Sequence, residues 1–267
     1  MNSKGLRQTF LEQGWAAFPP EPSVDEWCAS VRSDALAKAK DPEERVRWLR
    51  HGGTWFAGVN ALGADEAGRV GGGPPLQGQA MFFAMTLYGP TKLDPGQVSV
   101  IYPGYPKRDP SESHQAHNFR LRRDAAHVDG LLPTGAERRR KMQEPHAWIL
   151  GIGLTAQDQG ASPLVVWSGS HKIMQRAFAK ALETRDSAEW HTVDLTETYH
   201  AARRACFETC PRVPLPSAPR ATQLLHRLTL HGVAPWDDTA LAGPDGRAIV
   251  YFRPAAPQPP EGWLTLP

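Results

Sequence analysis

Short apolar runs separated by turn residues dominate the last two thirds of the chain. From about residue 96 onward, runs rich in valine, isoleucine and leucine lie between clusters of glycine and proline. Runs of this length and composition are typical of β-strands. The pattern predicts strands at residues 97–102, 119–126, 147–155, 163–168, 221–230 and 247–253.

The first third shows a different pattern, which indicates mainly helix and loop. One helix is predicted through about Lys40 and another after Asp41-Pro42, because proline suits the first helical turn. The apolar segment 76–88 is compatible with a buried helix or a strand. Two more helices are expected later, at 172–184 and 196–209. We therefore expect a single domain over residues 1–267, with a β core at about 96–253 and a helical N-terminal part at about 1–95 packed on it.

Composition and charge exclude several classes of partner. The chain of 267 residues has a net charge of +2, and a nucleic-acid binder usually shows a clear basic excess on one face. One basic run, at residues 138–141, is expected to be a solvated loop or helix face, with binding to an acidic partner as the lesser alternative. No apolar run is long enough to cross a bilayer. We expect a small-molecule substrate and neither nucleic-acid nor membrane partners.

The cysteines and the N-terminus indicate in which cellular compartment the protein is expected. Cys28, Cys206 and Cys210 are too few for a disulfide framework and fit a reducing environment. The first residues lack the apolar core of a signal peptide. We expect a cytoplasmic protein, and the sequence leaves its oligomeric state open.

One His-x-Asp, His127 to Asp129, occurs in the chain. Residues two apart on a strand point to the same side, so an imidazole and a carboxylate would face one cavity. Two histidines and a carboxylate form the facial site that holds non-haem Fe(II) and leaves positions open. The alternative interpretation is a polar strand end that enters a loop.

A third ligand is expected from a distant apolar segment, residues 223–235. In this segment, His231 comes just before Gly232, where a strand would end. His226 competes for the role, but it lies five residues earlier and would face the opposite side of an undisturbed strand. The alternative for His231 is a hydrogen-bonded core histidine.

An arginine follows on the next predicted strand. The turn at Asp245-Gly246 presents Arg247, whose planar fork suits the far carboxylate of a dicarboxylate keto acid. Arg253 lies six residues on, at the other end of the same strand face, and ranks second. The alternative for either side chain is a surface ion pair, which contributes little.

In this order, His127, Asp129, His231 and Arg247 resemble the Fe(II)/2-oxoglutarate dioxygenases, specifically the phytanoyl-CoA dioxygenase-like family. The stretch 162–172, which ends in Gly-Ser-His-Lys, and the stretches around the second histidine and the arginine are similar to that family too. The resemblance covers about residues 96–253. The chain departs from the family in an extra loop at 236–246.

The resemblance implies a double-stranded β-helix, a jelly-roll, cupin-like barrel with a cavity between its two sheets. It implies that His127, Asp129 and His231 bind Fe(II), that Arg247 anchors 2-oxoglutarate, and that Thr222 lies near the anchored carboxylate. The activity implied is hydroxylation of a substrate by O2, with conversion of 2-oxoglutarate to succinate and CO2. Related halogenases carry glycine or alanine at the position of Asp129, so the carboxylate favours oxygen transfer.

Three residues are candidates for substrate binding. Counting back by twos from His127 places Arg123 inside the barrel, where it would bind a carboxylate or phosphate or close a structural ion pair. Trp55 and Tyr102 are candidates for the entrance, with core packing as the alternative. The substrate itself is not specified. A cupin-like metal-dependent isomerase or lyase without 2-oxoglutarate and a non-catalytic ligand-binding barrel stay as alternative functions.

Overall fold

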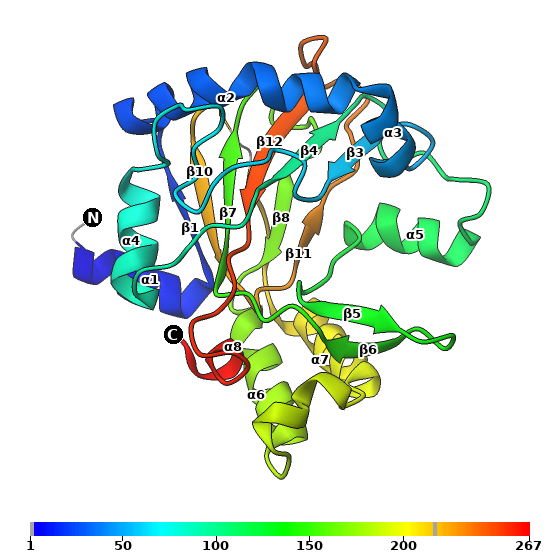
Figure 1. Cartoon of the computed structure of the whole chain (residues 1–267). Helices are drawn as coiled ribbons and strands as arrows, with labels where there is room; N and C mark the ends of the chain where they lie inside the picture. Colours follow the sequence, from blue (N-terminus) through cyan, green and yellow to red (C-terminus); the bar gives the residue numbers. More distant parts are fainter. Residues whose placement is uncertain (1–2, 216–217) are drawn as a thin grey trace.

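Two antiparallel β-sheets lie at the centre of the computed structural model, which describes residues 3–215 and 218–267 (Figure 1). The larger sheet has the strand order β1 (Trp15–Phe18), β10 (Thr222–His226), β7 (Trp148–Gly153), β12 (Arg247–Phe252), β4 (Gln97–Ile101), β3 (Trp55–Gly58) and β2 (Leu49–Arg50). The smaller sheet has the order β11 (His231–Val233), β8 (Leu164–Trp167) and β9 (Arg212–Leu215). The predicted class, mainly β with flanking helices, is confirmed.

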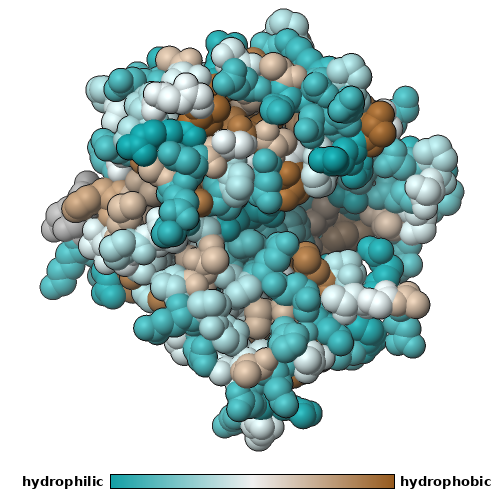
Figure 2. All heavy atoms as spheres, viewed as in Figure 1, coloured by the Kyte–Doolittle hydropathy of each residue, from teal (hydrophilic) through white to brown (hydrophobic). Residues whose placement is uncertain are grey.

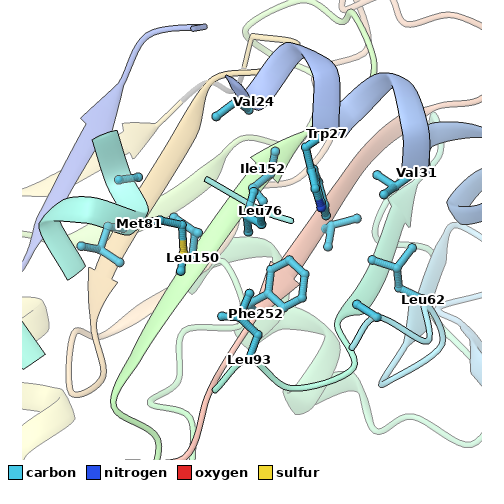
Figure 3. Close-up of a cluster of buried hydrophobic side chains, with 14 of the residues drawn as sticks. Val24, Trp27, Val31, Leu62, Leu76, Met81, Leu93, Leu150, Ile152 and Phe252 are labelled. Atoms are coloured by element: carbon cyan, nitrogen blue, oxygen red, sulfur yellow. The ribbon is translucent and has the colours of Figure 1, made fainter. Parts of the chain in front are cut away.

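Helices from the N-terminal third cover the outer face of the larger sheet. The longest, α2 (Pro22–Lys40), buries apolar residues at helical spacing, and Val24, Trp27 and Val31 point at the sheet (Figure 3). They pack against side chains such as Ile152 and Phe252. The same outer face also carries α1 (Ser3–Gln13), α3 (Pro42–Trp48) and α4 (Gln79–Tyr88). This layer makes one face of the sheet a continuous core and leaves the other face for a cavity.

The inner face of the larger sheet points at the smaller sheet. Strand side chains alternate between faces, so Ile149, Leu225 and Tyr251 turn inward while their neighbours pack under the helices. They meet Leu164 and Val166 of the smaller sheet in a separate apolar cluster. Apolar side chains from both sheets therefore fill part of the space between them.

A second group of helices packs beyond the smaller sheet. These are α6 (Ser170–Leu182), the 3-10 helix η1 (Ser187–Thr192), α7 (Thr196–Thr209) and the short α8 (Gly262–Thr265). A two-stranded hairpin, β5 (Leu131–Thr134) with β6 (Arg139–Met142), extends beside α7 (Figure 1). None of the helices in the described part of the chain combines the length and apolar character needed to span a bilayer.

The N-terminal third differs from its prediction. It supplies the strands β1, β2 and β3 as well as helices, and β1 pairs with β10 while β3 pairs with β4. The sheet therefore does not start at residue 96. These strands are four residues long or shorter, which is too short to produce a clear alternating pattern in the sequence.

The predicted strand at 119–126 is wrong, because helix α5 (His114–Arg123) occupies most of it. The Ser113 hydroxyl caps the helix by accepting a hydrogen bond from the Ala116 N–H at 3.1 Å. Asp124, in the left-handed conformation with φ 53°, ends it. The predicted strand at 221–230 also stops early, at His226.

Candidate metal centre

The backbone brings His127 and His231 side by side although 103 residues separate them in the sequence. The His127 N–H donates to the His231 carbonyl at 2.8 Å, and the His231 N–H donates back at 3.0 Å. The two ring centroids are 4.7 Å apart. His231 thus begins strand β11 and does not end a strand as predicted, and His127 pairs through a single isolated bridge.

Asp129 completes a group of three candidate ligands. Its Oδ1 lies 3.2 Å from His127 Nε2 and 3.8 Å from His231 Nε2. One donor atom from each residue lies within 4.8 Å of the other two. Two imidazole nitrogens and a carboxylate oxygen at this spacing fit the donor set of a non-haem Fe(II) site.

Local backbone geometry sets the direction of the His127–Asp129 segment. Asp124 and Ala125 both have φ 53°, which turns the chain sharply out of α5. The turn packs directly on β11, since a Cβ on Gly232 would lie 2.1 Å from the Asp124 carbonyl oxygen. The close approach therefore requires glycine at position 232, beside His231.

Each histidine is oriented by a backbone carbonyl two residues before it in the chain. His127 Nδ1 lies 3.0 Å from the Ala125 carbonyl oxygen, and His231 Nδ1 lies 2.9 Å from the Thr229 carbonyl oxygen. Hydrogen bonds of this kind assign the proton to Nδ1 and direct Nε2 at the metal position. A metal cation shared by His127 Nε2 and Asp129 Oδ1, which lie 3.2 Å apart, would bind to both atoms.

The charges of the group suit a cation. Burial lowers the pKa of His231 to about 4 despite the nearby Asp129 charge, so this imidazole is neutral at physiological pH. Burial disfavours ionisation of Asp129, but the hydrogen bond from His127 and the favourable electrostatic interactions with the His231 ring and the Arg253 guanidinium outweigh it, and they hold the pKa of Asp129 well below its usual value. A neutral imidazole and an ionised carboxylate are the forms that bind metal.

A cavity of about 360 Å³ extends from this group between the two sheets. Its apolar wall includes Ile149, Leu164 and Leu225, and its polar lining includes Tyr251 and Arg253. Arg253 Nη1 lies 3.5 Å from Asp129 Oδ2, so this arginine pairs with the candidate metal ligand.

Arg247 lies on the same strand face as Tyr251 and is 1% exposed. Its Nη2 lies 3.4 Å from the Tyr251 hydroxyl, and its Nη1 has no hydrogen-bond partner among the residues the structure describes. A buried guanidinium without a carboxylate partner is costly. This orphaned donor beside a residue that lines the cavity fits one carboxylate of a dicarboxylate ligand.

Among the other sequence candidates, Trp55 lines the cavity, and its indole N–H donates to the Ser99 hydroxyl at 3.0 Å. Thr222 does not line it. Thr222 pairs with Phe18 and Ile152 and shares their helix-covered face, so the expectation that it lies near the cosubstrate carboxylate is corrected. Tyr102 packs against the same outer cluster and is not among the lining residues, which favours the alternative of core packing.

The expectation that Arg123 lies inside the barrel is also corrected, because counting by twos assumed a strand and this segment forms helix α5. It is exposed on α5, with its guanidinium 4.7 Å from the Phe207 ring centroid. His226, the competing ligand, is buried on the opposite face of β10, where its Nδ1 accepts from the Leu228 N–H at 3.0 Å. It takes no part in the group of three.

Sequence reasoning missed several lining residues, among them Tyr105, Arg120 and Tyr251. Tyr251 could have been predicted, because counting by twos from Arg247 along the predicted strand places it on the same face. Tyr105 comes from a loop and Arg120 from a helix predicted as a strand, so no periodicity marked them.

Known proteins give a limited comparison. No protein-family model matches the chain, and no curated protein matches it. Solved structures that match include the non-haem α-ketoglutarate-dependent carbocyclase SnoK from nogalamycin biosynthesis, with 17% identity, a TM-score of 0.48, and coverage of 95% of this chain and 84% of that chain. Another is EctD from S. alaskensis with bound Fe, with 15% identity, a TM-score of 0.49, and coverage of 95% and 76%. A third is the epimerase SnoN in complex with Fe3+, α-ketoglutarate and nogalamycin RO, with 15% identity, a TM-score of 0.48, and coverage of 99% and 90%.

Proposed function

We propose that the protein is an Fe(II)- and 2-oxoglutarate-dependent dioxygenase that hydroxylates a small molecule with release of succinate and CO2. The observation that carries the proposal is the convergence of His127, Asp129 and His231 in the lining of one cavity. Tyr251, the hydrogen-bond partner of Arg247, lines the same cavity. The donor set suits ferrous iron, and the unpaired guanidinium suits a dicarboxylate.

The strand order supports a double-stranded β-helix as the framework. The run β10-β7-β12-β4 in the larger sheet faces β11-β8-β9, and His127 adds beside β11 through its bridge to His231. Two facing antiparallel sheets with a cavity between them support a jelly-roll as the framework of the proposal. Membership of the phytanoyl-CoA dioxygenase-like group is part of the same proposal, since the motif order is its main support.

Within this proposal each side chain has a defined task. His127, Asp129 and His231 would hold Fe(II) on one side and leave adjacent positions open. Arg247 and the Tyr251 hydroxyl would bind the far carboxylate of 2-oxoglutarate, and the apolar wall would limit access of water. When bound, the iron, the keto acid and O2 supply the oxidative chemistry, and the protein supplies position and shielding.

The first experiment is an anaerobic titration that separates this function from a cupin-like isomerase or lyase. Fe(II) is added to the protein, then 2-oxoglutarate, and the visible absorption is recorded. We expect a weak charge-transfer band that requires both ligands. Fe(II) binding without any band or affinity for 2-oxoglutarate would favour the isomerase or lyase alternative.

The second experiment measures succinate release in air. Release from 2-oxoglutarate by the Fe(II)-loaded protein excludes a non-catalytic barrel, even without a substrate. We expect Asp129→Ala to abolish release with the fold retained by circular dichroism. The matched control is Asp238→Ala, an exposed aspartate, which should behave as wild type. Undiminished release by Asp129→Ala would contradict the assignment.

A further inference from the structure

A second cavity, of about 370 Å³, lies on the other side of the candidate metal centre. Its walls come from helix α5, the β5–β6 hairpin and helix α7, and the molecular surface is hollowed in this region (Figure 2). His127, Asp129 and Arg253 line both cavities, so the two spaces meet at the candidate ligands. A metal with open positions there would be reachable from both sides.

Two half-buried arginines in this second cavity lack acidic partners. Arg140 comes from β6 and Arg203 from α7, and their guanidinium carbons lie 6.0 and 5.1 Å from the ring centroid of Tyr199. Arg203 also lies 4.6 Å from the Phe119 ring. Among the described residues, neither arginine has a carboxylate within 4.0 Å, and Arg140 Nη1 donates to the Leu131 carbonyl at 3.0 Å.

The other two arginines of the cavity are already neutralised. Arg120 donates from Nε and Nη2 to Glu112 Oε1 at 3.3 and 3.2 Å, and Arg253 pairs with Asp129. Burial lowers the pKa of Arg140, and repulsion by the charge of Arg203 lowers it further. Both guanidinium groups lack a carboxylate partner in the described part of the chain and are partly desolvated. An anion between them would relieve both costs.

The position of this arginine pair relates it to the metal centre. Tyr199 is buried and reaches the backbone of Val128, the residue between His127 and Asp129. Its ring and that of Phe119 therefore line the cavity beside the arginines, and the Tyr199 side chain also reaches the segment that carries the candidate ligands. A ligand with an anionic group and an aromatic or apolar body matches this arrangement.

We propose that the second cavity is the substrate site and that Arg140 and Arg203 bind a carboxylate or phosphate group of the substrate. The rest of the substrate would extend along Tyr199 toward His127. This inference rests on the proposed dioxygenase function and adds to it a substrate class, an anionic small molecule.

The test is calorimetric titration of the protein loaded with Fe(II) and saturated with 2-oxoglutarate under anaerobic conditions. Saturation keeps the probes away from Arg247. The probes are phenyl phosphate and benzoate, with benzyl alcohol as the neutral counterpart. We expect at least one anion to bind measurably and benzyl alcohol to bind at least tenfold more weakly. The stronger of the two anions indicates whether the site prefers phosphate or carboxylate.

Two double variants locate the binding. Arg140→Gln with Arg203→Gln should weaken anion binding at least tenfold. The matched control, Arg138→Gln with Arg204→Gln, removes the same charge from exposed neighbours on the hairpin and α7 and should bind as wild type. The single variants Arg140→Gln and Arg203→Gln should each lose part of the affinity, and they decide the matter if the double variant does not fold.

The outcomes separate the two proposals. Wild-type protein that binds neither anion, or arginine variants that bind as tightly as wild type, would overturn the anion site. Metal and 2-oxoglutarate binding are measured on the same samples. If they fail while the arginine-dependent anion binding persists, the anion site stands and the dioxygenase function falls.

Discussion

Arg212 binds both carboxylate oxygens of Asp124, with Nε and Nη2 each 2.8 Å from its nearest oxygen. Asp124 is 2% exposed, and its carbonyl also accepts from the Val233 N–H at 2.9 Å. The pair joins strand β9 to the turn that precedes His127. A bidentate bond of this kind fixes orientation as well as distance. The position of the first candidate ligand therefore depends on a residue 85 positions further along the chain.

We predict that Arg212→Met lowers the free energy of unfolding by about 2–3 kcal/mol, because it leaves a buried carboxylate without its partner. Metal affinity should fall as well, since the turn before His127 loses its clamp. Denaturant unfolding and Co(II) titration measure the two effects. The control is Arg220→Met, which breaks an exposed pair with Asp25 and should cost no more than about 1 kcal/mol. Equal effects of both substitutions would contradict the role given to Arg212.

Arg247→Met should separate binding from stability. The loss of a bidentate, charge-assisted contact should weaken 2-oxoglutarate binding by about a hundredfold or more, while Fe(II) binding is retained. Without ligand, the free energy of unfolding should stay the same or rise, because an unpaired buried charge is removed. Calorimetry and denaturant unfolding test the two parts, with Arg253→Met as the comparison. If Arg253→Met causes the larger loss of 2-oxoglutarate affinity, the anchor is Arg253.

Thr222→Val should leave 2-oxoglutarate affinity unchanged. Thr222 lies under the helices, and its buried Oγ1 has no hydrogen-bond partner among the described residues. Replacing this hydroxyl with a methyl group of similar shape should be neutral or raise the free energy of unfolding by up to about 1 kcal/mol. A clear loss of 2-oxoglutarate affinity on calorimetry would restore the original expectation for this residue.

Stability should fall in mild acid because several histidines are buried in the neutral form. Burial lowers the pKa of His171 to about 4, and burial also holds the pKa of His226 well below its usual value. The unfolded chain takes up protons below about pH 6.5, whereas the folded His171 does so only near pH 4. The contribution of His171 to the free energy of unfolding should therefore be fully present above about pH 6.5 and should be lost as the pH falls toward 4.

For His171 alone, the loss between pH 7.5 and pH 5 should be about 2 kcal/mol. Urea unfolding at a series of pH values gives the slope. His171→Asn should reduce the slope by about one proton, which is about 1.4 kcal/mol per pH unit, whatever its effect at pH 7.5. A variant with the wild-type slope would show that His171 does not titrate in this way.

The sequence by itself predicted the fold class and most strands of the larger sheet. Strands β4, β7 and β12 each lie within a predicted apolar run, because strands buried on both faces leave an uninterrupted signal. The helix at 196–209 was also predicted at its observed bounds. Short edge strands such as β1 left no such signal, and the charged helix α5 was taken for a strand because its amphipathic pattern is weak.

For the candidate site too, the sequence predicted one part and the tertiary structure decided the rest. The residue types and their order marked His127, Asp129, His231 and Arg247, because metal and carboxylate chemistry restricts the side chains that can serve. Their convergence was decided by tertiary structure, through the bridge between His127 and His231 and the clamp of Arg212 on Asp124. Which arginine faces which cavity also depended on contacts between distant elements. Local sequence specifies strand periodicity and donor chemistry, whereas the direction of a side chain at a turn is fixed by partners far along the chain.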